Sequence, residues 1–204
     1  VDEQILAVFE DIRPKAVKIG MIASKELMDC VALNLKNFEA ENIVIDPVMF
    51  AKNGFALMPP QNCEHFKKTM LSLADVLTPN IPEAQYLCGF EIKNQDDMIK
   101  AAKTLRSLGA KAVLVKGGHR DDNADDVLYD GKEIYILKSQ KIDTKNTHGT
   151  GCTLSSAIAS NLAKDYDLYE AVKKAKDYVY NAILHSLELG KGCGPTNHFY
   201  FLKD

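Results

Sequence analysis

The chain has 204 residues, 46% of them hydrophobic and 26% charged, and its 25 basic and 28 acidic residues give a formal net charge of −3. That composition is typical of a globular protein with a substantial core and argues against a disordered chain. The two signs are mixed along the sequence, so charge gives no reason to expect a nucleic acid or a membrane surface as a partner. The sequence has no apolar run near the roughly 18 residues that cross a bilayer, and its start lacks the pattern of a signal peptide. We therefore expect a cytoplasmic protein.

Short β-branched runs alternate with helical patterns over the first part of the chain, which is typical of a parallel sheet covered by helices. The best strand candidates are residues 16–20, 43–46, 75–79 and 112–117. Between them, cap residues, an early proline and terminal glycines mark helices. These predicted helices run from Ser24 to about Leu35, from Pro82 to Gly89 and from Asn94 to Gly109.

The pattern changes after the fourth strand candidate. Apolar and polar residues alternate on both sides of Asp130-Gly131, which predicts an antiparallel hairpin. Two more helices are expected, one opening near Thr150 and one from about Leu168 to Leu189, the second capped by Asp167 and closed by Gly190. We predict an α/β fold in one domain over residues 1–204, with a mainly parallel sheet and an antiparallel hairpin at one edge.

Ligands of such sheets bind beyond the carboxyl ends of the strands, so the polar residues there are site candidates. They fall in residues 46–49, 78–84, 115–119 and 146–153. In the last group, Gly149 and Gly151 allow backbone N–H groups to point at one spot where a helix begins, which favours an anion site. The alternative is a glycine-rich helix start that binds nothing. The spacing is not that of a Walker A loop.

Cys152 stands in the first turn of that helix, where the helix dipole favours thiolate over thiol. It is one of five cysteines that are far apart and form no C-x-x-C pair, which indicates reduced thiols rather than a zinc site. It could act as nucleophile, general base or redox sensor, or be a small buried apolar residue. The adjoining glycines favour a base that deprotonates an acceptor hydroxyl during phosphoryl transfer.

The other three groups of site candidates, residues 46–49, 78–84 and 115–119, contain charged and polar side chains that suit Mg²⁺ or phosphate. Asn80 and Glu83 suit Mg²⁺ if phosphates provide its remaining ligands, although Glu83 could simply complement a helix N-terminus. Asp46 ends a buried strand, where an acid is costly unless it is paired or binds something. Lys116 also ends an apolar strand and is suited to phosphate, whereas His119 is better explained as a loop histidine.

Six segments, taken in order, resemble the ribokinase-like superfamily and, within it, the hydroxymethylpyrimidine and hydroxymethylpyrimidine-phosphate kinases of thiamine biosynthesis. They are "AVKIGM", "VIDPVM", "LADVLTPNIPEA", "AVLVKGGH", "NTHGTGCTLSSAIA" and "LGKGCGPTNH". The resemblance implies a three-layer α/β/α sandwich. It also implies a kinase that uses ATP and Mg²⁺ to phosphorylate 4-amino-5-hydroxymethyl-2-methylpyrimidine and then the monophosphate it has made.

The same resemblance assigns roles to individual residues. It makes Gly149, Thr150 and Gly151 the anion hole and Cys152 the catalytic base, a position that is aspartate in many relatives and typically cysteine in the pyrimidine kinases. The remaining assignments are Lys116, Asn80, Asp46 and Thr147 to ATP, Glu83 to Mg²⁺, and Met21 and Val48, with Cys152, to the pyrimidine pocket.

The resemblance begins at Val1, beyond the glycine-containing strand and substrate-binding segment with which family members start. We therefore expect an N-terminally truncated kinase domain whose full-length form could be a homodimer. Three alternatives stay open: a pyridoxal or pyridoxine kinase of the same superfamily, a non-catalytic nucleotide-binding fragment, and a thiol redox enzyme.

Overall fold

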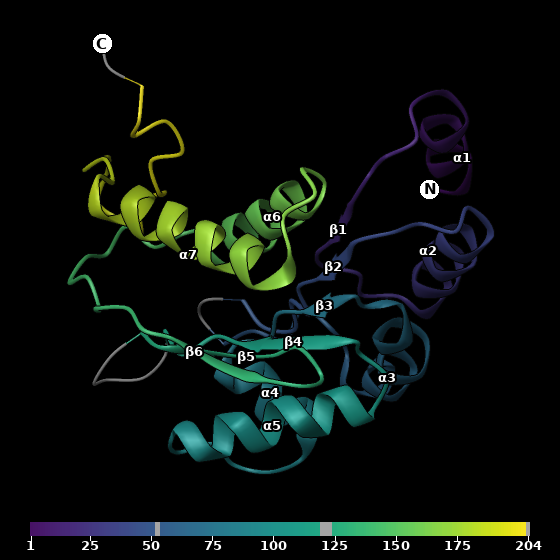
Figure 1. Cartoon of the computed structure of the whole chain (residues 1–204), viewed down its shortest axis with the longest axis horizontal. Helices are drawn as coiled ribbons and strands as arrows, with labels where there is room; N and C mark the ends of the chain where they lie inside the picture. Colours follow the sequence, from purple (N-terminus) through teal and green to yellow (C-terminus); the bar gives the residue numbers. More distant parts are fainter. Residues whose placement is uncertain (52–53, 119–123, 203–204) are drawn as a thin grey trace.

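In the computed structural model, which describes residues 1–51, 54–118 and 124–202, one sheet of six strands has the same order as the chain (Figure 1). The first four strands are parallel, and the last two add the antiparallel hairpin at the edge. The strands are β1 Val17–Ile19, β2 Ile43–Ile45, β3 Val76–Leu77, β4 Ala112–Val115, β5 Asp126–Tyr129 and β6 Ile134–Leu137. The predicted mixed sheet is confirmed, while His119 lies outside the described residues.

The described helices include the five that the sequence predicts. Ser24, Asn94 and Asp167 each accept a hydrogen bond from the backbone N–H three residues on, as N-caps do. The helices are α1 Asp2–Asp11, α2 Lys25–Asn37, α3 Cys63–Met70, α4 Ile81–Cys88, α5 Gln95–Ser107, α6 Thr150–Leu162 and α7 Leu168–Leu184, and short 3₁₀ turns, η1 Pro60–Asn62 and η2 Leu71–Leu73, flank α3.

Helix α7 is shorter than the sequence suggests. It ends at Leu184, so the prediction of a helix to Leu189 is wrong. Leu187 and Leu189 are 50% and 61% exposed. A helix continued through them would have no core to pack against, and short helical segments without such packing are marginal in water.

The strands are buried because helices cover both faces of the sheet. Val44, Val76 and Leu114 pack on one face with the apolar residues of α6 and α7. Their neighbours along the strands, such as Ile45 and Val113, pack on the other face with α2, α3, α4 and α5. Figure 1 shows α6 and α7 on one side of the sheet and α4 and α5 on the other. The three-layer α/β/α sandwich is confirmed.

No helix among the described residues combines the length and the apolar character that crossing a membrane requires.

The parallel strands bring three polar residues to one edge of the sheet. Asp46 and Lys116 directly follow β2 and β4, Asn80 comes three residues after the end of β3, and a bridge pairs Asn80 with Lys116. Helix α6 packs against β1 and β2. The carboxyl ends of the strands therefore meet the glycine loop that precedes α6.

Candidate active site

A buried ion pair lies at this edge. Lys116 Nζ is 2.7 Å from Asp46 Oδ1, with the two side chains 13% and 3% exposed. Thr78, directly after the intervening strand β3, donates its hydroxyl to the same Asp46 oxygen at 3.3 Å. Asp46 is therefore paired as the sequence analysis required of a buried acid, and Lys116 is held close to the start of α6.

The glycine loop passes directly beside this pair. A Cβ at Gly151 would lie 3.3 Å from Lys116 Nζ and 3.6 Å from Asp46 Oδ2. Gly149 is the N-cap of α6, with a left-handed φ of 80°, and no side chain caps the helix there. The positive end of the α6 dipole and the Lys116 ammonium thus reinforce each other at one point, which is the electrostatic requirement of an anion site.

The segment near the C-terminal end of the chain packs against the same loop. His148 donates its backbone N–H to the carbonyl of Gly194 at 3.1 Å and forms a bridge with Pro195. A side chain at Gly194 would collide with Asn146, which is buried. The close approach of the two segments fixes the entry into α6.

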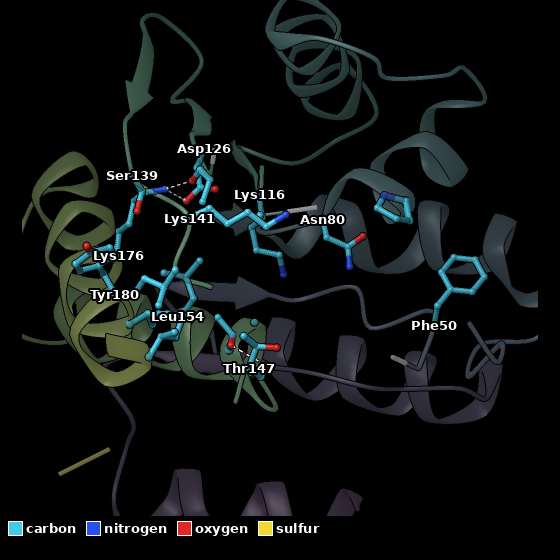
Figure 2. A pocket seen from close by; sticks show the side chains of 18 of the residues that line it. Phe50, Asn80, Lys116, Asp126, Ser139, Lys141, Thr147, Leu154, Lys176 and Tyr180 are labelled. Carbon is cyan, nitrogen blue, oxygen red and sulfur yellow. Dashed lines mark hydrogen bonds and ion pairs between the residues drawn. The ribbon is translucent and has the colours of Figure 1, made fainter. Parts of the chain in front are cut away.

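A cavity of about 1250 Å³, called here the large cavity, opens beside the anion site. Pockets that bind drug-sized ligands measure roughly 300–1,000 Å³, so the large cavity has room for a nucleotide. Five predicted site residues line it: Asn80, Lys116, Thr147, Thr150 and Gly151. Figure 2 shows Lys116, Asn80 and Thr147 between Tyr180 at one end and Phe50 at the other.

Cys152 faces a different space. It is exposed and borders a second cavity of about 520 Å³ together with Thr153, Ser156 and Tyr178. Successive helix residues are rotated by about 100°, so Gly151 and Cys152 point to different sides of the same turn. The exposure of Cys152 also removes the interpretation that it is a small buried residue.

The two residues predicted for the pyrimidine pocket line neither of these cavities. Met21 is 57% exposed, and Val48 is half-buried. They follow β1 and β2, the strands against which α6 packs, so they lie on the same edge of the sheet as the first turn of α6.

Glu83 and Asn80 form a capping box at the start of α4. The Asn80 side chain accepts from the Glu83 backbone N–H at 2.9 Å, and Glu83 Oε2 accepts from the Asn80 backbone N–H at 2.8 Å. Burial raises the pKa of Glu83 to about 7, against the opposing effect of the Lys116 ammonium. The helix-complementing role considered for Glu83 is thus present in the structure.

The described residues contain no cluster of three or more His, Cys, Asp or Glu side chains that could cage a metal ion. Mg²⁺ keeps most of its waters and commonly binds through one or two carboxylates and substrate phosphates. Asp46 and Glu83 fit that pattern, because both carboxyl groups lie near Lys116 and the anion site.

Two residues of the large cavity were absent from the sequence predictions. Asp126 at the start of β5 and Lys176 on α7 form a second buried ion pair, Oδ2 to Nζ 2.5 Å. Burial raises the pKa of the Asp126 carboxyl. The available signal was an acid opening an otherwise apolar hairpin strand, but its partner lies 50 residues away.

Comparison with known proteins agrees with this geometry. The family model described as phosphomethylpyrimidine kinase matches residues 1–197. A hydroxymethylpyrimidine/phosphomethylpyrimidine kinase of Aquifex aeolicus is 47% identical over 94% of this chain and 76% of its own length.

Two solved structures share the fold. A phosphomethylpyrimidine kinase of Clostridium difficile superposes with a TM-score of 0.79 at 43% identity, over 89% of this chain and 74% of the other. The ADP complex of a Bacillus subtilis pyridoxal kinase gives 0.89 at 38% identity, over 98% and 75%. The chain belongs to the phosphomethylpyrimidine kinase family, whose members are phosphotransferases.

Proposed function

We propose that the chain transfers the γ-phosphoryl group of ATP to the hydroxymethyl group of 4-amino-5-hydroxymethyl-2-methylpyrimidine, and then phosphorylates the resulting monophosphate. One observation carries this proposal. The first turn of α6 has a nucleotide-sized cavity beside Gly151 on one side and the exposed Cys152 on the other. A kinase needs this arrangement, because donor and acceptor approach the transferred group from opposite sides.

The chain's residues contribute mainly position and charge. The N–H groups of Thr150 and Gly151 and the Lys116 ammonium stabilise the negative charge of the transferred group, while Asn80 and Thr147 contact the nucleotide from the wall of the large cavity. Mg²⁺, when bound with the nucleotide, neutralises phosphate charge. Glu83 and Asp46 would face the waters of the ion. One oxygen of Glu83 already accepts the Asn80 backbone N–H in the capping box.

Cys152 is the proposed base of the first transfer. Its thiolate accepts the proton of the hydroxymethyl group as the oxygen attacks phosphorus. The acceptor of the second transfer is a phosphate, which is already ionised, so that step needs no base. Met21 and Val48 are proposed to contact the pyrimidine ring from the same edge of the sheet.

A second candidate, a pyridoxal kinase, rests on the similarity to the ADP complex of the Bacillus subtilis pyridoxal kinase. Both substrates are flat heteroaromatic rings that bear a primary alcohol, so the phosphate chemistry would be the same. A cytoplasmic location, one domain over residues 1–204 and a homodimer of the full-length protein stay predictions from the sequence.

The test is ATP consumption with Mg²⁺ and one acceptor at a time: the hydroxymethylpyrimidine, its monophosphate or pyridoxal. Turnover of both pyrimidines supports the proposal. Turnover of pyridoxal alone overturns the substrate assignment and leaves the phosphate chemistry in place. ADP binding without turnover of any acceptor would support the nucleotide-binding alternative.

A further inference from the structure

The wall of the large cavity contains an ion pair that the proposed mechanism does not use. Lys176 Nζ lies 2.5 Å from Asp126 Oδ2, and the two side chains are 12% and 8% exposed. Lys176 also donates to the carbonyl of Ala124 at 2.8 Å. Figure 2 shows the Lys176 side chain extending from α7 to Asp126, so the pair connects α7 to the hairpin. The Lys176 ammonium is therefore committed to protein partners.

The second oxygen of Asp126 has a specific partner as well. Oδ1 accepts the backbone N–H of Gly117 at 2.8 Å. Gly117 directly follows Lys116, whose own N–H donates to the carbonyl of Pro79 at 2.8 Å. Two hydrogen bonds thus hold the backbone on either side of the Lys116 Cα: the Lys116 N–H is held by Pro79, after β3, and the Gly117 N–H is held by Asp126.

Gly117 has no freedom to move toward the hairpin. A Cβ at this position would collide with the carbonyl of Asp125. Backbone packing and the Asp126 hydrogen bond therefore define one path for the turn that presents Lys116 to the anion site.

Stability alone does not explain why this wall contains two charges. The desolvation of a buried ion pair offsets much of its attraction, and an apolar pair of similar size is often as stable. A leucine and a methionine would fill the space, but they would leave the Gly117 N–H without its acceptor.

We propose that Asp126 and Lys176 are positioning residues for phosphoryl transfer. Lys176 holds the Asp126 carboxylate, Asp126 fixes the Gly117 amide, and the amide places the Lys116 ammonium beside Gly151. The proposal deepens the proposed function and rests on it, since the work of Lys116 is to bind the phosphates of the nucleotide.

Two double variants isolate the hydrogen bond to Gly117 from the charges. D126N/K176M and D126L/K176M both lack the ion pair, but only the asparagine retains an acceptor for the Gly117 amide. K173M, on an exposed lysine of the same helix, is the matched surface control. Thermal unfolding establishes that all the variants are folded before the other measurements are compared.

Two readouts respond to positioning and not to general stability. We expect amide hydrogen exchange at Gly117 to accelerate about tenfold or more in D126L/K176M and to stay slow in D126N/K176M. We expect ADP binding to weaken about tenfold in D126L/K176M, while the binding of adenosine, which has no phosphate, is unchanged. D126N/K176M should bind ADP more tightly than D126L/K176M does, because it keeps the acceptor for Gly117, and K173M should bind both ligands as the wild type does.

Equal ADP affinity of the two double variants, or a Gly117 amide that exchanges equally fast in both, would overturn the positioning role. Loss of adenosine binding together with ADP binding would also overturn it, because the cavity itself would then have changed. A wild-type chain that binds no ADP would instead refute the proposed function, and the catalytic purpose of the pair with it.

Discussion

Lys116 and Asp46 are 70 residues apart in sequence, yet their side chains form a 2.7 Å ion pair with Thr78 bonded to the same carboxylate. They end two parallel strands that are separated by β3. The pair holds the Lys116 ammonium at the first turn of α6 before any ligand arrives. Electrostatic stabilisation by such preorganised groups is commonly the largest single contribution to phosphoryl transfer.

The first prediction concerns this pair. Lys116→Met should lower kcat/KM by about a hundredfold or more through the lost phosphate contact. It should also destabilise the fold by about 3–5 kcal/mol, because Asp46 would remain buried without a partner. The double variant Asp46→Asn/Lys116→Met should recover stability in urea unfolding but not activity. Recovery of activity in the double variant would remove Lys116 from the mechanism. The control is Lys103→Met, which removes an exposed lysine and should change neither activity nor stability.

The second prediction tests the close approach at Gly151. Gly151→Ala places a methyl group 3.3 Å from Lys116 Nζ, so the ammonium must shift. We expect kcat to fall about tenfold or more, with the melting temperature nearly unchanged. Gly192→Ala is the matched control, since no heavy atom lies within 4 Å of the added carbon. Wild-type kcat in Gly151→Ala would contradict the anion hole.

The third prediction separates the two transfers. Cys152→Ala should reduce the first transfer by about 10²–10⁴-fold, the usual contribution of a general base, and leave the second nearly intact. Rates with the two acceptors are measured separately under saturating ATP. Ser156→Ala, one turn further along the same exposed face, serves as the control. An equal loss in both transfers would exclude Cys152 as the base.

The fourth prediction follows from the buried Glu83 carboxyl, whose pKa rises from 4.5 to about 7. Between these values the folded chain binds more protons than the unfolded chain, so stability falls as the pH rises. The shift corresponds to about 3 kcal/mol. Unfolding by urea at pH 5, 6, 7 and 8 should show this slope in the wild type and a flatter one in Glu83→Gln, which can still cap α4. The exposed variant Glu10→Gln should retain the wild-type slope; an unchanged slope in Glu83→Gln would contradict the assignment.

Local signals account for the part of the fold that the sequence predicts. The caps at Ser24, Asn94 and Asp167 act within four residues, and the hairpin turn at Asp130-Gly131 is equally local. The end of α7 depends on whether Leu187 and Leu189 find a core, which no local pattern reveals. The helices α1 and α3 were not predicted, because neither start has a side chain that caps it, so both lack the local signal that marks α2, α5 and α7.

The same division applies to the site. Asp46, Asn80 and Lys116 could be found because polar residues at the ends of apolar strands are conspicuous. The pairing of Asp126 with Lys176 depends on a tertiary contact between the hairpin and α7, so the acid that opens β5 does not reveal its partner. The direction of Cys152 depends on the rotation of one helical turn relative to the sheet, which is fixed only after α6 has packed.

The order of the strands also bears on how the enzyme matures during synthesis. Because neighbouring strands follow one another along the chain, the sheet can grow strand by strand as the polypeptide leaves the ribosome. The anion site cannot form in that way. Asp46 and Lys116 must wait for Gly151, and the loop before α6 must wait for its contact with Gly194. A nascent chain can therefore complete the six described strands and still be unable to hold a phosphate until Gly194 has emerged.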